Sequence, residues 1–166
     1  LVAAYSFNET TGTAVADASG NGNTGSIANA TRTTAGKYGG ALVFDGTTAL
    51  VTVADSPSLR LTTAMTLEAW VNPSTVSGAW RDVIYKGPDD TYYLEGSSGS
   101  NPPATGGTFT SALIGTSALP LNSWSHLAAT YDGATLRLYV NAVQVASRSV
   151  VGPISTSTGA LSIGGN

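Results

Sequence analysis

The chain has 166 residues, enough for one domain with a buried core, and it carries a formal net charge of -3. That charge excludes the basic surface expected of a protein that binds nucleic acid or acidic lipid. There is no cysteine, which excludes disulfide and thiol chemistry, and no stretch approaches the roughly 20 apolar residues of a membrane-spanning helix. A cysteine-free chain rich in Ser, Thr and Asn, with 42% hydrophobic residues, favours a turn-rich β protein and suits a secreted bacterial module.

Alternation of apolar and polar residues predicts short strands along most of the chain. Turn-forming pairs such as Asp45-Gly46 and Gly87-Pro88 separate the strands, and no segment shows a convincing helical stripe. A short turn is expected after Ser56-Pro57, and a long exposed loop over Gly96–Gly107. This spacing predicts an all-β sandwich of two antiparallel sheets in a single domain over residues 1–166. The predicted strands, in chain order, are Val2–Phe7, Ala41–Phe44, Leu50–Val53, Thr66–Pro73, Asp82–Tyr85, Tyr92–Glu95, Thr108–Ile114, His126–Tyr131, Thr135–Ser147 and Ala160–Ile163.

The clearest local unit is the segment from Trp124 to Val145, in which alternate apolar residues on two arms face one side. Asp132-Gly133 makes the turn between these arms. Asn141-Ala142 then stands where an Asn-Gly pair would make a second tight turn. Because alanine tolerates positive φ poorly, this second turn is predicted to be of another type or mildly strained.

The stretch DASGNGNTG, from residue 17 to residue 25, alternates oxygen-bearing side chains with residues that let the backbone curl. Calcium binds about six to eight hard oxygen ligands, whereas magnesium requires a stricter octahedron. The pattern therefore predicts a Ca²⁺ site formed by Asp17, Ser19, Asn21 and Asn23. An EF-hand is excluded, because the twelfth loop position is Ala28 and no flanking helices are predicted. The alternative is a plain turn closed by Asx hydrogen bonds.

Candidate catalytic groups are few, and the sequence predicts that the protein is not an enzyme. His126 is the only histidine, so it cannot form a zinc site or a catalytic triad alone, and a structural role is expected. A glycosidase needs two carboxylates that flank one bond. Asp89 and Asp90 are adjacent in a turn and point apart, while Glu68 and Glu95 are isolated in the sequence.

Aromatic residues between positions 80 and 93 form a candidate ligand surface, with charged residues among them. Sugars stack on aromatic rings while neighbouring polar groups bind their hydroxyls. Tyr92 and Tyr93 lie on opposite sides of one predicted strand, so at most one of them lines a given face. The alternative is that these rings fill the core. The predicted ligand-binding residues are Trp80, Arg81, Tyr85 and Tyr92.

Four segments, in order, resemble laminin-G-like domains, which are jelly rolls of the concanavalin A-like group. They are Leu1–Gly25 with its D-x-S-G-N-G-N-x-G loop, Ala41–Leu59, Met65–Pro73 and the hairpin Trp124–Val145. The resemblance implies a jelly-roll sandwich of two sheets with a calcium ion at one edge. It also implies a secreted or surface protein, because many members are parts of secreted glycosidases or adhesins and some bind glycans.

The family pattern continues past a segment like Leu161–Asn166 to a final strand of the type G-x-I-D-E-V-R-I-Y, which this sequence lacks. In the family that strand lies beside the first strand and supplies a further carboxylate to calcium. We therefore expect the predicted strand Val2–Phe7 to have an open edge, to which a complementary β-strand peptide could bind.

Together these features predict a non-catalytic, calcium-binding recognition or adhesion module of a larger secreted bacterial protein, with a glycan or protein ligand on a surface. Two alternatives remain at this point. One is a carbohydrate-binding module, and the other is the large fragment of a split domain that binds a β-strand peptide in a calcium-dependent way.

Overall fold

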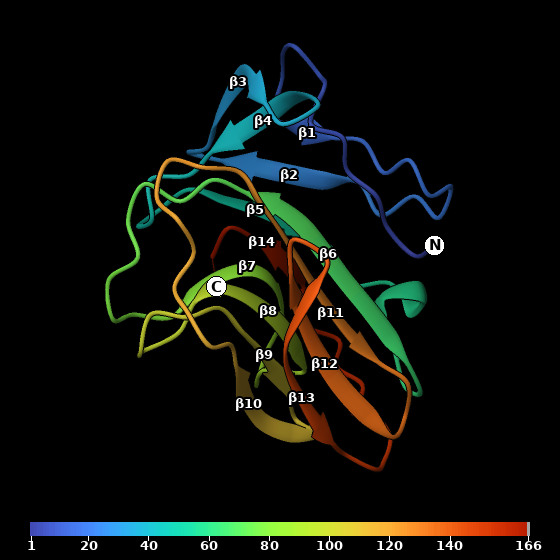
Figure 1. Ribbon diagram of the computed structural model, residues 1–166. Coiled ribbons are helices and arrows are strands. Elements are labelled where there is room, and N and C mark those ends of the chain that lie inside the picture. Colours follow the sequence, from blue (N-terminus) through green and yellow to red (C-terminus); the bar gives the residue numbers. More distant parts are fainter. Residues whose placement is uncertain (166) are drawn as a thin grey trace.

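The computed structural model describes residues 1–165, and it confirms an antiparallel β sandwich (Figure 1). The sheets are an eight-stranded sheet with the order β1-β2-β5-β14-β7-β8-β9-β10, a four-stranded sheet with the order β13-β12-β11-β6, and the pair β3-β4. No helix in the described part of the chain is long and apolar enough to cross a membrane. The elements are β1 (Ala14–Val15), β2 (Gly25–Ala28), β3 (Thr31–Gly36), β4 (Gly39–Val43), β5 (Leu50–Val53), the 3-10 helix η1 (Pro57–Leu59), β6 (Met65–Val71), β7 (Arg81–Lys86), β8 (Tyr92–Ser97), β9 (Ala104–Gly107), β10 (Thr110–Ile114), β11 (Ser125–Tyr131), β12 (Thr135–Val140), β13 (Val143–Ser149) and β14 (Leu161–Ile163).

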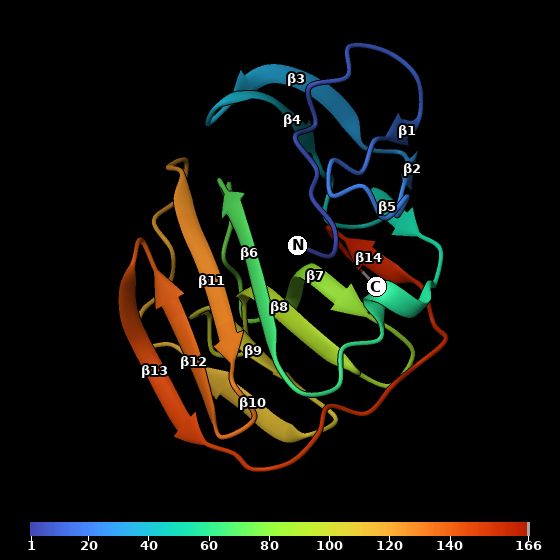
Figure 2. The ribbon, with the colours of Figure 1, turned by 90° about the vertical axis from the view of Figure 1, so that its right-hand side faces the viewer.

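The core lies between the four-stranded sheet and the β7–β10 part of the larger sheet (Figure 2). Strand β11 shows how the sequence places its residues there, because burial alternates along it without a break. Leu127, Ala129 and Tyr131 are buried, and Leu127 and Ala129 lie opposite apolar residues of both β6 and β12. The period-two pattern read from the sequence therefore corresponds to one buried face.

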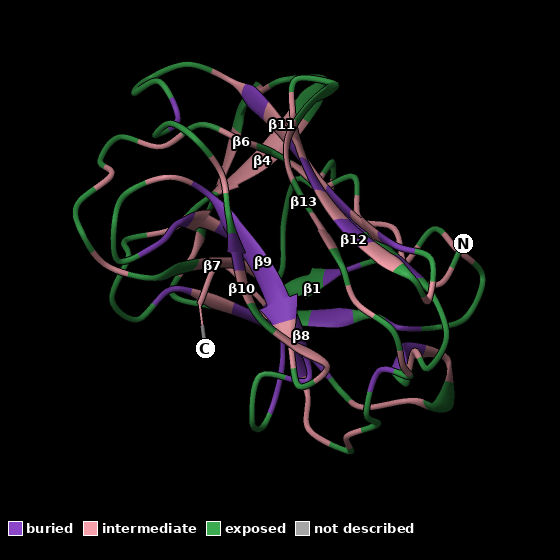
Figure 3. Ribbon diagram, turned by 60° about the horizontal axis from the view of Figure 1, so that its bottom comes forward, coloured by how far each residue is buried: buried purple, intermediate pink, exposed green. Residues whose placement is uncertain are grey.

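Strands β7 and β8 carry different residues on their two faces, and this difference positions the candidate site. Tyr92 and Leu94 are fully buried members of the core. Successive side chains of a strand point to opposite faces, so Tyr93 and Glu95 lie on the face turned away from the core. Tyr93 and Glu95 are also mostly buried, and Figure 3 shows that β8 and β9 are among the most buried strands.

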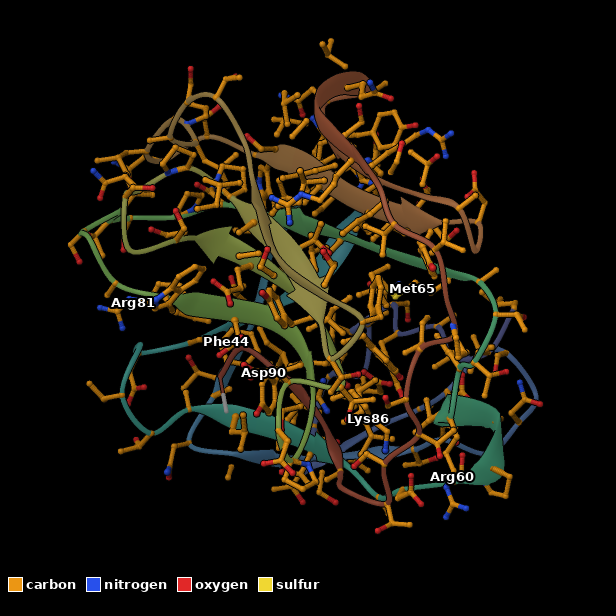
Figure 4. The ribbon with its side chains drawn as sticks, turned by 90° about the horizontal axis from the view of Figure 1, so that it is seen from below. Phe44, Arg60, Met65, Arg81, Lys86 and Asp90 are labelled. Carbon is orange, nitrogen blue, oxygen red and sulfur yellow. The ribbon has the colours of Figure 1, made fainter. Side chains whose placement is uncertain are left out.

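A buried ion pair ties the end of β7 to the segment before η1. Lys86 Nζ lies 2.6 Å from Asp55 Oδ1 and also donates to the carbonyl of Gly159. Arg60 binds the other oxygen of Asp55 and lowers the pKa of that carboxyl to about 2, together with Lys86. Figure 4 shows Lys86 inside the structure and Arg60 at its margin. A charged residue as buried as Lys86 requires such a partner.

The prediction that Val2–Phe7 forms a strand is wrong for the described structure, since these residues join no sheet ladder. Ala4 instead donates to Asp17 Oδ1 and accepts from the backbone N–H of Ala18. The backbone groups of this segment are thus taken up partly by the loop after β1. Phe7 adopts a positive φ of 54°, which interrupts any extended run there.

Three other expectations concern connections between strands. The exposed loop predicted over Gly96–Gly107 is wrong, because β9 lies within it and its first three residues are buried. The short turn predicted after Ser56-Pro57 is confirmed as η1. Asn141 and Ala142 both have positive φ, 50° and 66°, so the mildly strained alternative for this turn is confirmed.

Candidate functional site

A pocket of about 190 Å³ lies where β7 begins. Trp80, Arg81 and Asp82 form one wall, and the loop from Gly46 to Leu50 together with Gly164 and Gly165 forms the rest. The Trp80 side chain is 51% exposed, which is unusual for a large apolar ring. Arg81 lies at the margin of the molecule in Figure 4. The pocket thus combines an open aromatic surface with polar groups.

The carboxylate of Asp45 holds the loop wall of the pocket in place. Its Oδ1 accepts from the backbone N–H groups of Thr47, Thr48 and Ala49 at 2.8–2.9 Å. These bonds, that from Ala49 above all, hold the pKa of Asp45 well below its usual range. Arg81 Nη1 also donates to the carbonyl of Gly46 at 3.0 Å. The loop is therefore fixed at its own base and to β7, so the pocket is preformed.

The outer face of β7 and β8 continues the pocket with more aromatic and acidic residues. Tyr85 lies opposite Tyr93 in the ladder, and Asp82 lies opposite Glu95. Gly106 of β9 lies on the other side of Tyr93, and a Cβ atom there would come within 2.5 Å of Tyr93 Oη. The glycine therefore leaves room for the phenol ring of Tyr93, which is mostly buried on this face.

The structure places two of the four predicted ligand-binding residues in the pocket and a third farther along β7. Trp80 and Arg81 line the pocket, and Tyr85 lies on the adjoining outer face. Tyr92 does not belong to this surface, because it is only 1% exposed and its hydroxyl donates to Leu59 O at 2.8 Å inside the core. Burial, followed by the charge of Asp55, raises the pKa of Tyr92. That residue was predicted wrongly, and Tyr93 takes the outward position that the alternation allowed for one of the two.

Sequence reasoning missed Asp82 and Glu95 as a pair, because Glu95 is isolated in the sequence and meets Asp82 only across the β7–β8 ladder. Burial, with the charge of Asp90 added, raises the pKa of Asp82 to about 6. Burial and the charges of Asp82 and Asp90 raise the pKa of Glu95 to about 8. At neutral pH the Glu95 carboxyl is thus mainly neutral and that of Asp82 mainly ionised. Pairing β7 with β8 outward from the turn at residues 87–91 would have predicted that the two residues lie close together. It would not have predicted that they lie directly opposite, because bulges in β7 shift the register.

The loop from Asp17 to Asn23 forms a closed network around one carboxylate. Asp17 accepts from the backbone N–H groups of Ala4, Ser19 and Asn23 at 2.9–3.0 Å and from Ser19 Oγ at 2.7 Å. Burial alone would raise the pKa of Asp17, but these bonds outweigh it and lower the pKa to about 2. Such a network alone makes a stable Asx-type turn.

The same loop directs three side chains to one backbone oxygen. Val2 O accepts from Ser19 Oγ, Asn21 Nδ2 and Asn23 Nδ2 at 2.9–3.0 Å. The two ends of a carboxamide differ little in shape, so rotation would turn the Asn21 oxygen toward the same point, whereas Asn23 Oδ1 accepts from Ser56 Oγ at 2.6 Å. Carboxylate, hydroxyl, amide and carbonyl oxygens are ligands that calcium prefers, so the donor set fits this ion. In residues 1–165 no group of three or more His, Cys, Asp or Glu residues forms a metal cluster, so a site here would use neutral oxygens.

His126 lies far from these residues in the sequence, on the outer face of the four-stranded sheet. Its ring is 5.2 Å from that of Trp70, and its Nε2 atom is 3.7 Å from Glu68 Oε2. These contacts agree with the structural role expected of this histidine.

Comparisons with known proteins place this geometry in a family context. The family model described as Laminin_G_3, concanavalin A-like lectin/glucanases superfamily, matches residues 45–166. A search of the curated proteins gave no match.

Several solved structures share the fold at low sequence identity. Domain 4 of AbnA, an extracellular GH43 arabinanase from Geobacillus stearothermophilus in complex with arabinotriose, matches with a TM-score of 0.79 and 20% identity. That match covers 100% of this chain and 84% of the other. The binding domain of Paraclostridial Mosquitocidal Protein 1 matches with a TM-score of 0.74 and 14% identity over 99% of this chain and 44% of the other. Botulinum neurotoxin type C, whose cell entry depends on interaction with two ganglioside molecules, matches with a TM-score of 0.65 and 12% identity. That match covers 95% of this chain and 41% of the other. This chain therefore spans less than half of both toxin chains.

Proposed function

This chain belongs to the Laminin_G_3 family of the concanavalin A-like lectin/glucanases superfamily, and from this membership we propose that it is a non-catalytic carbohydrate-binding module. The observation that carries the proposal is the preformed pocket with exposed Trp80 beside Arg81 and Asp82. Similar domains described with arabinotriose or gangliosides support a glycan as the ligand.

The chemistry of the pocket suits a sugar ring. The apolar face of a pyranose or furanose stacks on an indole, while carboxylates and guanidinium groups bind its hydroxyls. Trp80 would supply the stacking surface, and Arg81 and Asp82 the polar contacts. Tyr85 lies five residues beyond Trp80, roughly 16 Å along the chain at about 3.3 Å per residue, so only a longer oligosaccharide would reach both rings.

The pair Asp82 and Glu95 is not arranged for hydrolysis in this proposal. A glycosidase needs both carboxyl groups to flank the scissile bond within reach of the substrate. Glu95 is only 6% exposed, and its Oε2 atom is buried. It can therefore act on a ligand only through Asp82 and the pocket wall.

A glycan array followed by calorimetry of the hits tests the proposal. We expect Trp80→Ala to weaken binding roughly 5- to 150-fold, because one aromatic stacking contact is worth about 1–3 kcal/mol. Trp70→Ala is the matched control, since Trp70 is a partly exposed tryptophan on the other sheet. No binding by the wild-type protein to plant, bacterial or animal glycans would contradict the proposal, as would hydrolysis of a bound glycan. Loss of binding in the Trp70 variant alone would move the site to the other sheet.

We further propose that Ca²⁺ binds the loop of Asp17, Ser19, Asn21 and Asn23 and stabilises the fold without taking part in chemistry. The convergence of three of these side chains on Val2 O supports the proposal. Calcium would supply positive charge that holds the N-terminal segment against the loop. A site with a single carboxylate is expected to be weak.

Thermal unfolding with millimolar calcium and with EDTA tests this second proposal. We expect calcium to raise the melting temperature of the wild-type protein and to leave Asp17→Asn unchanged. Asp45→Asn is the matched control, because Asp45 also accepts several loop N–H groups but lies outside the calcium loop. A melting temperature indifferent to calcium would mean that the loop is only a turn.

Binding of a complementary β-strand peptide is a further candidate, supported by the open edge of β6. This strand ends the four-stranded sheet among the described residues, and Val2–Phe7 joins no ladder. Calorimetry with a peptide of the type G-x-I-D-E-V-R-I-Y, in calcium and in EDTA, tests it. No heat in either buffer would reject it.

We also propose that the module acts outside the cell, on a surface or as part of a larger secreted protein. The similar domain of an extracellular arabinanase supports this location. Detection of the full-length protein in the culture medium or on the cell surface would test it.

A further inference from the structure

The carboxyl group of Glu95 has an unusual environment on the outer face of the large sheet. Glu95 is only 6% exposed, and its Oε2 atom has no hydrogen-bond partner. A buried polar atom without a partner is costly and points to a missing water, ion or ligand group. Glu95 lies directly opposite Asp82, which lines the pocket beside Trp80. The unpartnered oxygen therefore lies one strand away from the pocket, behind the wall residue Asp82.

The groups around this pair are mostly acidic, and Arg81, which keeps its positive charge at the pocket, forms no ion pair with them within the described residues. Asp90, in the turn between β7 and β8, adds a third carboxylate that acts on both Asp82 and Glu95. Strand β9 presents only Ala104 opposite Glu95. Arg81 donates to Gly46 O. Within residues 1–165, no ion pair involves any of these three carboxylates.

Tyr93 and Arg148 complete the charged and titratable surroundings. Burial raises the pKa of Tyr93 to about 12, with Glu95 as the next cause, so the phenol stays neutral. Arg148, whose charge acts to lower the pKa of Tyr93, donates to Ser111 and Ala112. Neither residue neutralises Asp82. The part of the site at Asp82 and Glu95 is thus rich in acceptors, and a ligand group that brings donors and positive charge is favoured there.

We propose that Asp82 and Glu95 form a subsite for a positively charged amine on the bound glycan, that is, for an amino sugar. This inference rests on the carbohydrate-binding function proposed above. Asp82 binds the ammonium group in a charge-assisted hydrogen bond while the sugar ring stacks on Trp80. Glu95 is a positioning residue, because it acts on the ligand through Asp82. The positive charge of an ammonium group bound at Asp82 favours the ionised form of Glu95. A fraction of the protein molecules therefore releases the Glu95 proton to solvent when the amine binds.

Two matched pairs of probes test the proposal: glucosamine with N-acetylglucosamine, and galactosamine with N-acetylgalactosamine. Acetylation removes the charge and retains the ring. At pH 6.5 the free amine is mostly protonated, as for an α-amino group with a pKa of about 7.7–8.0. We expect the wild-type protein to bind at least one amine roughly tenfold more tightly than its acetylated partner, the effect of about 1.4 kcal/mol. Calorimetry in two buffers of different ionisation enthalpy should also detect proton release with the amine.

Three variants locate the effect. Asp82→Asn should abolish the preference for the amine. Glu95→Gln should abolish the proton release while part of the preference remains, a result that a merely structural role would not give. Asp89→Asn is the control, since Asp89 is an exposed carboxylate of the same turn. Thermal unfolding of each variant verifies that it folds.

Several results would overturn the proposal, and they can be told apart from failure of the proposed function. Equal binding of amine and acetylated sugars, or binding of neutral glycans only, would reject the amine subsite and leave carbohydrate binding intact. No binding to any glycan would reject both. Proton release caused by calcium alone, and lost in Asp82→Asn, would assign the pair to a metal ion and also reject the amine subsite.

Discussion

Replacing Glu95 with glutamine should make the stability of the protein less dependent on pH. The carboxyl of Glu95 is buried beside Asp82 and Asp90, and its pKa is raised from the ordinary value of 4.5 to about 8. The folded protein therefore retains a proton that the unfolded chain loses. Between about pH 4.5 and 8 the folded state binds more protons, so stability is fully present at low pH and falls as pH rises through this window.

The size of this effect follows from the shift itself. One pKa unit corresponds to about 1.4 kcal/mol, so a rise from 4.5 to about 8 makes ionised Glu95 cost at most roughly 5 kcal/mol by pH 9. Water reaching the ionised pair and coupling with Asp82 reduce this value, so we expect a loss of about 2–4 kcal/mol. For a domain of this size, that corresponds to roughly 4–16 °C in melting temperature.

Thermal or urea unfolding of the wild-type protein and of Glu95→Gln, from pH 5 to pH 9, measures the effect. Glutamine has nearly the shape of a neutral glutamic acid and cannot ionise. The curves of stability against pH should therefore diverge above about pH 5, with the wild-type protein losing more stability by pH 9. Asp89→Asn should follow the wild-type curve. Parallel curves for the wild-type protein and Glu95→Gln would refute the assignment of Glu95 as a buried neutral acid.

Three other predictions address packing, turn strain and the two loop carboxylates. Gly106→Ala should destabilise the fold by about 1–3 kcal/mol in urea unfolding, because its Cβ would meet Tyr93 Oη at 2.5 Å; an unchanged midpoint would show that the ring moves freely. Ala142→Gly should stabilise the hairpin by roughly 0.5–1 kcal/mol, since the φ of 66° suits glycine; a lower melting temperature would contradict the strain. Asp17→Ala should lower the free energy of unfolding by about 1–3 kcal/mol and speed hydrogen exchange at Ala4, whereas Asp45→Ala should chiefly weaken glycan binding. Weaker glycan binding in Asp17→Ala together with faster exchange at Ala4 in Asp45→Ala would contradict these roles.

Much of the fold could be predicted from the sequence, because strands such as β6, β11 and β12 bury one face, whereas the largely exposed β3 has no such pattern and was not predicted. Strand β11 is the clearest case, since the alternation of Leu127, Ala129 and Tyr131 with polar residues is the alternation of burial itself. The short strands β1, β2 and β9 could not be predicted. They contain Gly, Ala, Ser and Thr with little apolar contrast, and long-range pairing decides their conformation.

Only part of the candidate site could be predicted, because the sequence does not show which face of a sheet a strand residue lies on. Exposed aromatic and basic residues are visible in a sequence, and Trp80 and Arg81 do line the pocket. The face on which a strand residue lies is harder to predict. A period of two gives two equivalent choices, and only the pairing with β7 puts Tyr93 outward and Tyr92 in the core. Bulges in β7 then bring Asp82 opposite Glu95, a contact that no local pattern encodes.

The two loop carboxylates show how similar bonding can serve different purposes in one fold. Asp45 accepts only from residues of its own loop, so its network shapes a local wall of the pocket. Asp17 accepts from its own loop and also from Ala4, in a segment that joins no sheet ladder. Because backbone groups without a ladder need other partners, Asp17 links the N-terminal residues to the sandwich. The pocket therefore depends on local order at Asp45, whereas the margin of the sandwich depends on a long-range contact at Asp17, and a cation bound there would strengthen the second without altering the first.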